Sequence, residues 1–247
     1  GLSATALGGE SKAEALRSVA VGFRAHAKGT NDVAVGGAAA ASGGQSVAVG
    51  LLSKASALRA VAVGNGAQAS NIDAVAIGRD SEADALSATA LGDRAKARGT
   101  QSLALASAAE AEGYQAVAVG TRAGSKAVNR VALGVESSAT ALNGLAVGTS
   151  PSVRKEGGKA VGGGASALEE KSLALGFQAK GKAEKAVALG AQSIADLAAG
   201  QAGYDFATQS ASQSEDTTWK STLGAVSVGN EKDSRQITHV AAGTQDT

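Results

Sequence analysis

An alanine flanked by larger aliphatic residues recurs every fourteen residues along most of the chain, and a glycine closes each of these triplets. The spacing holds through fourteen copies without an insertion, so each closing residue serves as a marker. The markers are Gly8, Gly22, Gly36, Gly50, Gly64, Gly78, Gly92, Gly120, Gly134, Gly148, Gly162, Gly176 and Gly190, with Ala106 in the eighth copy. Periodicity of this kind predicts a solenoid in which one unit stacks on the next.

Each unit predicts two short strands joined by turns. The residue two positions before the marker is always Ala, the next is always Val, Leu or Ile, and small residues recur three and five positions after the marker. This alternation has the period of two that strands require, and Gly, Asn, Asp and Ser fill the turns. Alanine also favours helices, but the frequent glycines and the β-branched residues two positions apart argue against a helix. The predicted fold is all-β, a parallel β-roll of 14-residue coils.

The same alternation predicts which side chains face inward. Alanine and the small residues of the second strand would close a very thin interior, so the larger aliphatic residues of the first strand point out of the coil. They form two outward columns, the second of which is interrupted at Thr5, Thr89 and Lys159. An exposed apolar patch of this extent predicts an obligate oligomer with the columns at its axis. The predicted axis residues are Val19, Val21, Val33, Val35, Val47, Val49, Val61, Val63, Val75, Ile77, Val117, Val119, Val131 and Leu133.

Two copies depart from the pattern. Ala106 indicates either that the marker turn does not require a positive φ or that one copy tolerates a cost of about 1 kcal/mol. The segment TSPSVRKEGGK, residues 149–159, holds the only proline and places Lys159 in the apolar columns. We expect a bulged coil there, with its lysine turned to solvent, in preference to a specific binding loop.

The period is lost after about Leu197. Residues 198–223 hold half of the six aromatic residues, and we expect Tyr204, Phe206 and Trp219 to cap the stack rather than to bind a ligand. The chain is therefore predicted to consist of coils over residues 1–197, an irregular capping or insert segment over 198–223 and a C-terminal segment over 224–247.

Composition excludes an ordinary core and several classes of partner. Only 2% of the 247 residues are aromatic and none is methionine, so bulky interdigitated side chains are scarce. A formal net charge of +1 predicts no binding of nucleic acid or of an anionic membrane. The chain has no cysteine, which excludes disulfides, thiolate metal sites and cysteine nucleophiles. The sequence contains no run of about 18 apolar residues, so no membrane span is predicted. Because Gly1 lies within the repeat pattern, we expect the sequence to be a piece of a longer or processed protein.

Catalytic and cofactor motifs are not found in the sequence. His26 and His239 lie in unrelated parts of the pattern, and His26 takes an outward position that lysine holds in other copies, so a solvated surface residue is expected. Serine recurs as a turn residue, and stretches such as VGGGASA lack the Gly-Lys-Ser/Thr ending of a phosphate loop. Calcium-binding β-rolls require regularly repeated Asp, hexapeptide acyltransferases require a period of six, and ice-binding solenoids require ranks of outward Thr. The sequence shows none of these three patterns. We predict no enzyme activity, no cofactor and no metal.

The units SVAVGFRAHAKG, QSVAVGLLSKASA and KAVALGAQSIA resemble the head repeats of trimeric autotransporter adhesins of the YadA-like type. The segment GAVSVGNEKDSRQITHVAAGTQDT, residues 224–247, resembles the neck that joins such a head to its coiled-coil stalk. The resemblance covers nearly the whole chain, is weakest over residues 200–222, and departs from the common neck pattern at His239, where Asn is usual. The neck residues so identified are Arg235, Gln236, Ile237, Thr238 and Val240.

The resemblance implies a left-handed parallel β-roll and a homotrimer of side-by-side chains that cross over one another at the neck. It also implies display on the surface of a Gram-negative bacterium, an outer-membrane anchor formed by a C-terminal barrel outside this sequence, and attachment to host extracellular matrix proteins or host cells. No membrane contact is expected for this part of the chain. We predict a non-enzymatic adhesin head that binds extended partners through its repetitive outer surface. The alternative is a structural spacer or self-association module without its own host ligand.

Overall fold

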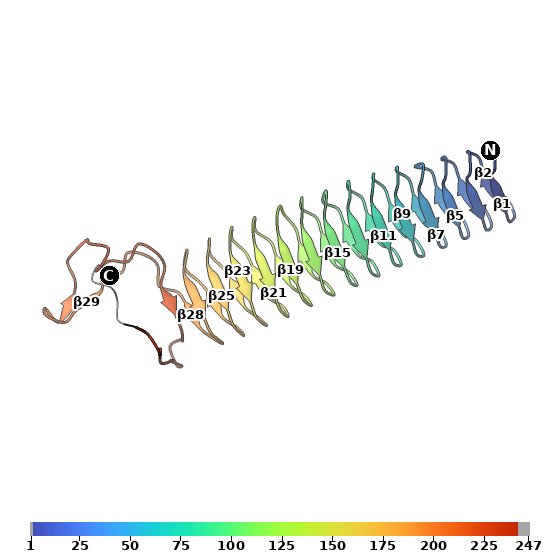
Figure 1. Cartoon of the computed structure of the whole chain (residues 1–247). Coiled ribbons are helices and arrows are strands. Elements are labelled where there is room, and N and C mark those ends of the chain that lie inside the picture. The colour runs from blue at the N-terminus through green and yellow to red at the C-terminus, as the bar shows by residue number, and fades with distance from the viewer. Residues whose placement is uncertain (1, 242–247) are drawn as a thin grey trace. The chain divides into compact units, whose positions relative to one another are not determined.

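The computed structural model describes residues 2–241, whose regular structure consists of strands and turns without a helix. By its internal contacts the chain divides into two compact units, Gly1–Ala139 and Thr140–Thr247. In each unit short strands stack side by side in sequence order (Figure 1). The predicted all-β parallel solenoid of fourteen-residue coils is therefore confirmed.

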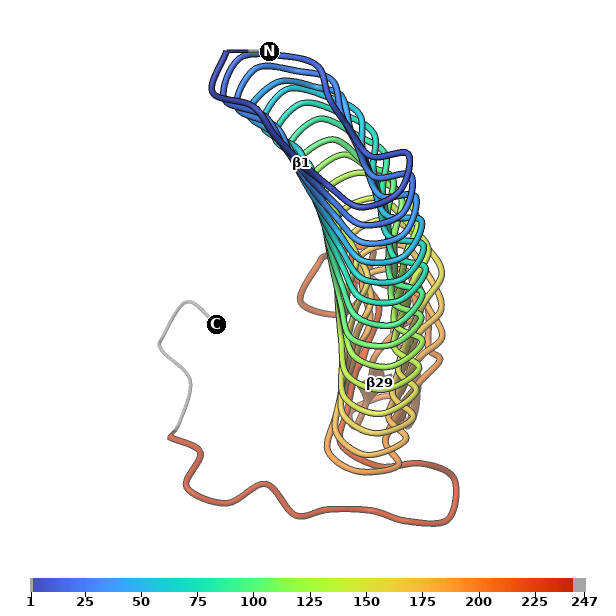
Figure 2. The same cartoon turned by 90° about the vertical axis from the view of Figure 1, so that its right-hand side faces the viewer.

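In the first unit every coil contributes one strand to each of two parallel sheets. Each residue pairs with the residue fourteen positions further on, as Val47 does with Val61. In Figure 2 the coils of this unit, coloured blue to green, nest as flattened loops. The three-residue A strands are β1 (Thr5–Leu7), β3 (Val19–Val21), β5 (Val33–Val35), β7 (Val47–Val49), β9 (Val61–Val63), β11 (Val75–Ile77), β13 (Thr89–Leu91), β15 (Leu103–Leu105), β17 (Val117–Val119) and β19 (Val131–Leu133). The two-residue B strands are β2 (Lys12–Ala13), β4 (His26–Ala27), β6 (Ala40–Ala41), β8 (Lys54–Ala55), β10 (Gln68–Ala69), β12 (Glu82–Ala83), β14 (Lys96–Ala97), β16 (Glu110–Ala111), β18 (Gly124–Ser125) and β20 (Ser138–Ala139).

The core of the first unit consists almost entirely of alanine. Ala48 and Ala62 of the A strands and Ala55 and Ala69 of the B strands have no exposed surface. Side chains alternate between the two faces of a strand, so the aliphatic neighbours of each A-strand alanine lie on the outside. The predicted thin interior closed by methyl groups is thus confirmed. Buried serines serve the turns, as Ser81 does by donating a hydrogen bond of 3.0 Å from its hydroxyl to the carbonyl of the marker three residues before it.

The marker positions require glycine for two reasons: the backbone has a positive φ, and the next coil leaves no space for a Cβ. Their φ angles range from +108° to +141°, outside the narrow left-handed region open to other residues. A Cβ on Gly64 would lie 2.4 Å from the carbonyl oxygen of Gly78 in the next coil. Ala106 adopts φ +104°, so the first of the two alternatives for this copy is wrong: the turn keeps its positive φ and the alanine bears the strain.

Each coil also contains a second turn, which the sequence placed only approximately. The marker turn of one coil spans residues 22–25 and its second turn spans residues 29–32, and each closes through a backbone hydrogen bond of 3.2 Å between its first and last residues. The third residue of each turn, Arg24 or Asn31, has a positive φ. Two left-handed positions per coil therefore fall mostly on polar residues other than glycine.

One coil of the first unit buries an arginine within the alanine core. Arg130 is 2% exposed, and its Nη1 donates a hydrogen bond of 2.8 Å to the carbonyl of Ala139. Among the described residues no carboxylate pairs with it, and neither its Nε nor the nearby Ser137 hydroxyl has a hydrogen-bond partner. Burial lowers the pKa of the Arg130 guanidinium below its ordinary value, because a charged group is poorly solvated there.

We expect Arg130→Ala to raise the thermal midpoint of the chain by about 5 °C, since it removes a buried charge without a counter-ion. Alanine stands at the corresponding position of several other coils, for example Ala60 and Ala116. Thermal unfolding followed by circular dichroism measures the change, and Arg122→Ala, at an exposed turn, is the matched control. A lower midpoint for Arg130→Ala than for the control would contradict the prediction.

The second unit continues the same coil pattern and then interrupts it. Its A strands are β21 (Leu145–Val147), β23 (Lys159–Val161), β25 (Leu173–Leu175), β27 (Val187–Leu189) and β31 (Val226–Ser227). Its B strands are β22 (Ser152–Val153), β24 (Ser166–Ala167), β26 (Lys180–Gly181) and β28 (Ile194–Ala195), and a small antiparallel hairpin is formed by β29 (Tyr204–Asp205) and β30 (Ser210–Ala211).

The coil that contains the only proline does not bulge, so that prediction is wrong. Lys159 pairs with Leu145 in the ordinary register, and Val153 fills the interior position that alanine holds elsewhere. Space for the larger side chain comes from two glycines, because a Cβ on either Gly144 or Gly158 would lie 3.0 Å from Cγ1 of Val153. The change in volume is thus compensated within the core. Lys159 itself is exposed, as predicted.

The repeat resumes after the irregular segment. Val226 of β31 pairs in parallel with Val187 of β27, which lies 39 residues earlier, one period of fourteen plus an insertion of 25. Ser227 pairs with Ala188 and so occupies the place of the invariant alanine. The loss of the period after Leu197 therefore reflects an insertion within a further coil and not the end of the stack.

Candidate assembly surface

The outer face of the A strands carries most of the large aliphatic side chains of the coils. We call these residues the apolar ladder; they flank each buried alanine, as Val61 and Val63 flank Ala62. All fourteen predicted axis residues lie on this face of the first unit, where thirteen are half-buried and Ile77 is 36% exposed. The structure brings these residues together as the sequence predicted. Their position at an axis stays a prediction.

The ladder is continuous because parallel pairing places like residues above one another. Val61 lies between Val47 and Val75, each fourteen residues away on a neighbouring strand. Packing along the stack covers part of each side chain and leaves the rest facing outward. A column of this extent exceeds the apolar patch of a typical soluble monomer. An apolar surface of this extent is typical of an interface with another chain.

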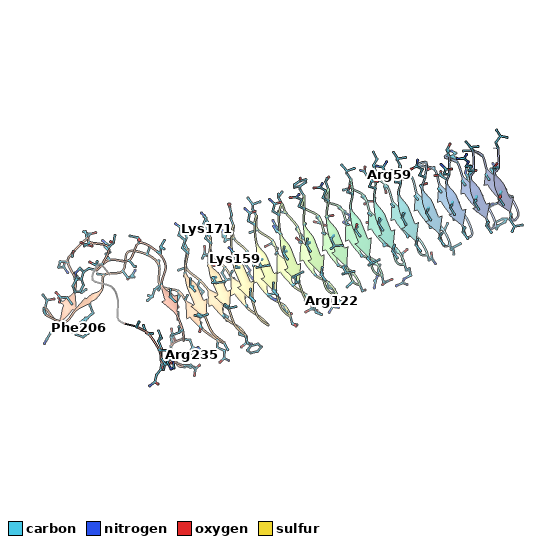
Figure 3. The ribbon with its side chains drawn as sticks, in the orientation of Figure 1. Arg59, Arg122, Lys159, Lys171, Phe206 and Arg235 are labelled. Carbon is cyan, nitrogen blue, oxygen red and sulfur yellow. The ribbon has the colours of Figure 1, made fainter. Side chains whose placement is uncertain are left out.

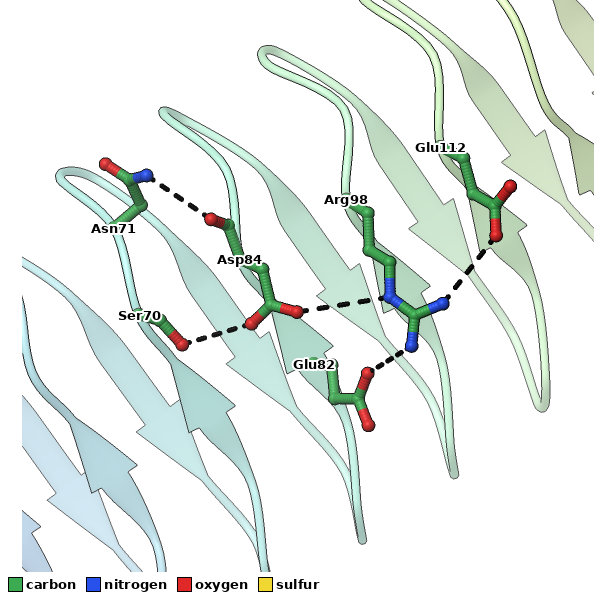
Figure 4. Close-up of polar contacts among 6 residues, drawn as sticks. All are labelled: Ser70, Asn71, Glu82, Asp84, Arg98 and Glu112. Carbon is green, nitrogen blue, oxygen red and sulfur yellow. Dashed lines mark hydrogen bonds and ion pairs between the residues drawn. The ribbon is translucent and has the colours of Figure 1, made fainter.

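The opposite face, formed by the outward residues of the B strands, is polar and partly paired. Figure 4 shows Arg98 among three carboxylates, with its Nη2 2.7 Å from Glu82 Oε2, its Nη1 3.6 Å from Glu112 Oε1 and its Nε 4.0 Å from Asp84 Oδ2. Ser70 donates a hydrogen bond of 3.0 Å to Asp84. The hydrogen bond to Glu82 and the neighbouring carboxylates raise the pKa of Arg98 above its ordinary value. Around Arg98 the charges of this face are therefore paired within one chain, whereas the outward lysines Lys12, Lys54 and Lys96 form no ion pair among the described residues.

Charged side chains at the turns pair from one coil to the next. Arg59 and Arg122 lie at opposite edges of the first unit (Figure 3). Arg59 Nη2 donates a hydrogen bond of 2.7 Å to Asp73, fourteen residues on, and Arg122 pairs in the same way with Glu136. The hydrogen bond from Arg59 lowers the pKa of the Asp73 carboxyl. Sequence analysis missed these pairs, although opposite charges fourteen residues apart were a usable signal.

The two histidines lie in separate parts of the described chain. His26 lies in β4 with its Nε2 2.9 Å from Glu14 Oε1, and His239 is exposed in the neck. Over residues 2–241 no three metal-ligating side chains gather in one place. Nor does this part of the chain contain a helix long and apolar enough to span a membrane.

The aromatic residues predicted to cap the stack are exposed in a single chain. Tyr204 and Phe206 meet edge to face, with ring centroids 5.2 Å apart, and Phe206 is 86% exposed at the tip of its hairpin (Figure 3). Trp219 is 40% exposed. The rings do not cover a coil of their own chain, so a capping role would need another chain and stays a prediction.

Arg235, one of the predicted neck residues, packs against the marker turn of Gly190 instead. Its guanidinium carbon lies 3.1 Å from the position that a Cβ on Gly190 would take. At the earlier marker glycines the atoms at this place belong to the backbone of the next coil. The Nη2 atom donates to the carbonyl of Ala191 at 2.6 Å, and Nη1 donates to Ser193 Oγ at 3.1 Å. Arg235 thus substitutes for a following marker turn. The other predicted neck residues, Gln236, Ile237, Thr238 and Val240, are exposed; residues 242–247 of the predicted neck lie outside the described residues.

Comparisons with known proteins identify the repeats. The family model described as the YadA head domain repeat (two copies) matches residues 1–25, 27–53, 55–81, 83–105 and 131–150. Over 57 residues the chain is 54% identical to the autotransporter adhesin BadA of Bartonella henselae, a match that covers 22% of this chain and 2% of that protein. A solved structure, the collagen-binding domain of the Yersinia adhesin YadA, matches with 26% identity over 84% of this chain and 79% of that chain, at a TM-score of 0.28. The chain spans a small fraction of the length of the curated relative.

Proposed function

Because the chain belongs to the YadA-like trimeric autotransporter adhesins, as part of a head, we propose that three copies assemble through the apolar ladder and attach a bacterium to host matrix proteins or host cells. The observation that carries the proposal is the contrast between the two faces of each coil. The A-strand face is aliphatic, whereas the B-strand face is polar and carries ion pairs such as that of Arg98 with Glu82. Assembly would bury the first face and present three copies of the second.

Attachment would use repetition in place of a deep pocket. The outward residues of the B strands recur once per coil, so an extended partner lying along the coils would meet equivalent positions many times. Many weak contacts then add to a strong one, because each contact after the first is effectively intramolecular. We propose fibrous matrix proteins as the partner class on this ground.

The proposed organisation follows the sequence-based division of the chain. Residues 1–197 would form the head coils, residues 198–223 an insert, and residues 224–247 a neck that crosses between chains and leads to a stalk. Ile237 and Val240 support the last assignment, since each is 69% exposed in a single chain and would gain a partner there. Surface display by a Gram-negative bacterium, with the anchor elsewhere in the protein, belongs to the same proposal.

Binding of the purified chain to immobilised collagen, fibronectin and cultured host cells tests the function, after light scattering has established its mass. We expect a trimer that binds at least one of these surfaces and that binds far more weakly when diluted until it dissociates. A stable trimer that binds none of the matrix proteins and no host cell would overturn the adhesive function. A stable monomer would overturn the assembly as well.

The internally paired charges of the B-strand face favour a second candidate, a spacer or self-association module. Arg98 and its three carboxylates leave little unsatisfied charge for a ligand. Deleting one whole coil, residues 51–64, removes fourteen residues and keeps the register. A spacer would retain its behaviour apart from reach, whereas an adhesive surface would lose binding when the deletion removed its contact residues.

A further inference from the structure

A second apolar column runs along one edge of the first unit, apart from the ladder. We call it the edge column; it consists of the second residue of each second turn, six positions before the marker. Leu2 of the first coil is 81% exposed, and the other large members are between 38% and 46% exposed. They are Leu16, Leu58, Ile72, Leu86, Tyr114 and Val128. Thr30, Gly44 and Thr100 take this position in the remaining coils. Aliphatic residues exposed singly are ordinary, but a column that recurs in most coils forms a surface.

The two edges of the coils differ in how often they carry a large apolar residue. Both edges carry ion pairs, such as Arg24 with Glu10 at 2.8 Å in the marker turns and Arg59 with Asp73 in the second turns. Large apolar residues are scattered in the marker turns, as Phe23 is, but recur at one position of the second turns. The edge column therefore marks the second turns as the edge suited to a largely apolar partner. That edge leads directly into the A strands of the next coil.

In the second unit the edge column changes from apolar to acidic. Leu142 is its last apolar member, and the following positions are Glu156, Glu170 and Glu184. The change to acid begins in the coil that holds Lys159, the only charged residue of the ladder. Lys159 lies on the A-strand face (Figure 3), and its Nζ contacts only the carbonyl of Gly157, at 3.4 Å. Among the described residues Lys159 forms no ion pair, and Glu156 lies within electrostatic reach of Lys171, whose pKa it helps to raise, without forming an ion pair.

We infer that the edge column of one copy packs against the apolar ladder of the next, so that Glu156 of each copy pairs with Lys159 of its neighbour. This inference rests on the proposed assembly through the ladder. Both columns advance by one strand spacing per coil, so their residues stay matched along parallel copies. Rotational symmetry keeps equal coils at equal height, which brings residues 156 and 159 of adjacent copies to one level. A contact between two different surfaces closes into a ring when the rotation closes.

Packing of one ladder against a second ladder would be unfavourable for Lys159. A ladder packed on a second ladder at equal height would place Lys159 against Lys159 in an apolar interface, which costs both desolvation and repulsion. Contact with the edge column gives the lysine a carboxylate at the same coil. In the first unit the ladder meets mainly apolar residues of the edge column, and beyond Glu156 it meets Glu170 and Glu184, which pair with Lys171 and Lys185 of their own chain. The partner that fits the edge column is thus a second copy of this chain.

Charge reversal tests the contact. Glu156→Lys and Lys159→Glu, made singly, are each expected to lower the temperature of dissociation by several degrees and to raise the concentration at which the assembly dissociates about tenfold. The double variant, which restores opposite charges across the interface, is expected to recover most of both losses. Lys180→Glu, on the B-strand face, is the matched control and should leave both quantities unchanged. At about 1 M salt the differences should shrink, because screening then acts over about 3 Å.

The outcomes separate this inference from the proposed function. If the unchanged chain is a stable monomer, the proposed assembly fails and the contact with it. If the chain is a trimer but the single variants match the control, or the double variant shows the sum of the two single losses, the edge contact is wrong while the assembly stands. Recovery in the double variant alone supports the pairing of residues 156 and 159.

Discussion

Replacing Gly64 by alanine should lower the thermal midpoint of the chain by about 10 °C or more, which corresponds to about 3 kcal/mol in a chain of this length. Gly64 has φ +136°, a conformation that a residue with a Cβ adopts only under strain. The added Cβ would also lie 2.4 Å from the oxygen and 2.7 Å from the carbon of the Gly78 carbonyl. These atoms belong to the backbone of the next coil, so relief requires separating two coils. Differential scanning calorimetry measures the loss.

Two variants control for the loss of glycine itself. Gly124→Ala places a Cβ in open space, since no atom outside its chain neighbours lies within 4 Å, and it should change the midpoint by only a degree or two. Ala106→Gly is the reverse change at a marker with φ +104°, and it should raise the midpoint. Equal effects of Gly64→Ala and Gly124→Ala would show that the marker conformation is not what limits stability.

The interior of the coils could be predicted because its rule is local. A period of two places each A-strand alanine opposite to its aliphatic neighbours, and a residue as small as Ala62 can pack in a thin core whatever the rest of the chain does. The apolar ladder, including all the residues assigned to an axis, follows from the same alternation. No long-range information was needed for either.

The turns could not be predicted in the same detail. Positive φ is expected of Gly and Asn, yet Arg59 and Asp73 adopt it because the coil must reverse within four residues and their side chains then pair across coils. The energy of that pairing comes from a residue fourteen positions away, which local propensity does not include. The sequence therefore placed the turns approximately, but it did not predict their conformation or their ion pairs.

Interruptions of the repeat were hidden by compensation at a distance. Val153 fits in place of alanine only because Gly144 and Gly158 lie beside it. The sequence of that one coil, taken alone, predicts a bulge. The return of Val226 and Ser227 to the stack is masked by 25 inserted residues and by serine at the invariant alanine position. In both cases the signal lies in neighbouring coils.

The second large effect concerns assembly: Val61→Asp should convert the proposed trimer into monomers without unfolding the coils. Val61 lies on the ladder between Val47 and Val75, and its side chain points out of the coil, so a lone chain can expose the carboxylate to water. In the trimer three carboxylates would be buried at one level of an apolar interface, at a cost of several kcal/mol. Light scattering should give one third of the original mass, while circular dichroism retains the strand signal.

Gln68→Asp provides the matched control for this change. Gln68 takes the outward position of β10, on the polar B-strand face, and is exposed. The same aspartate there should leave both mass and thermal midpoint unchanged, because the face stays in water. A Val61→Asp chain that remains trimeric with an unchanged midpoint would show that the apolar ladder faces solvent in the assembly, and the subunits would then have to meet through another surface. Loss of the trimer in Val61→Asp alone places the ladder between chains.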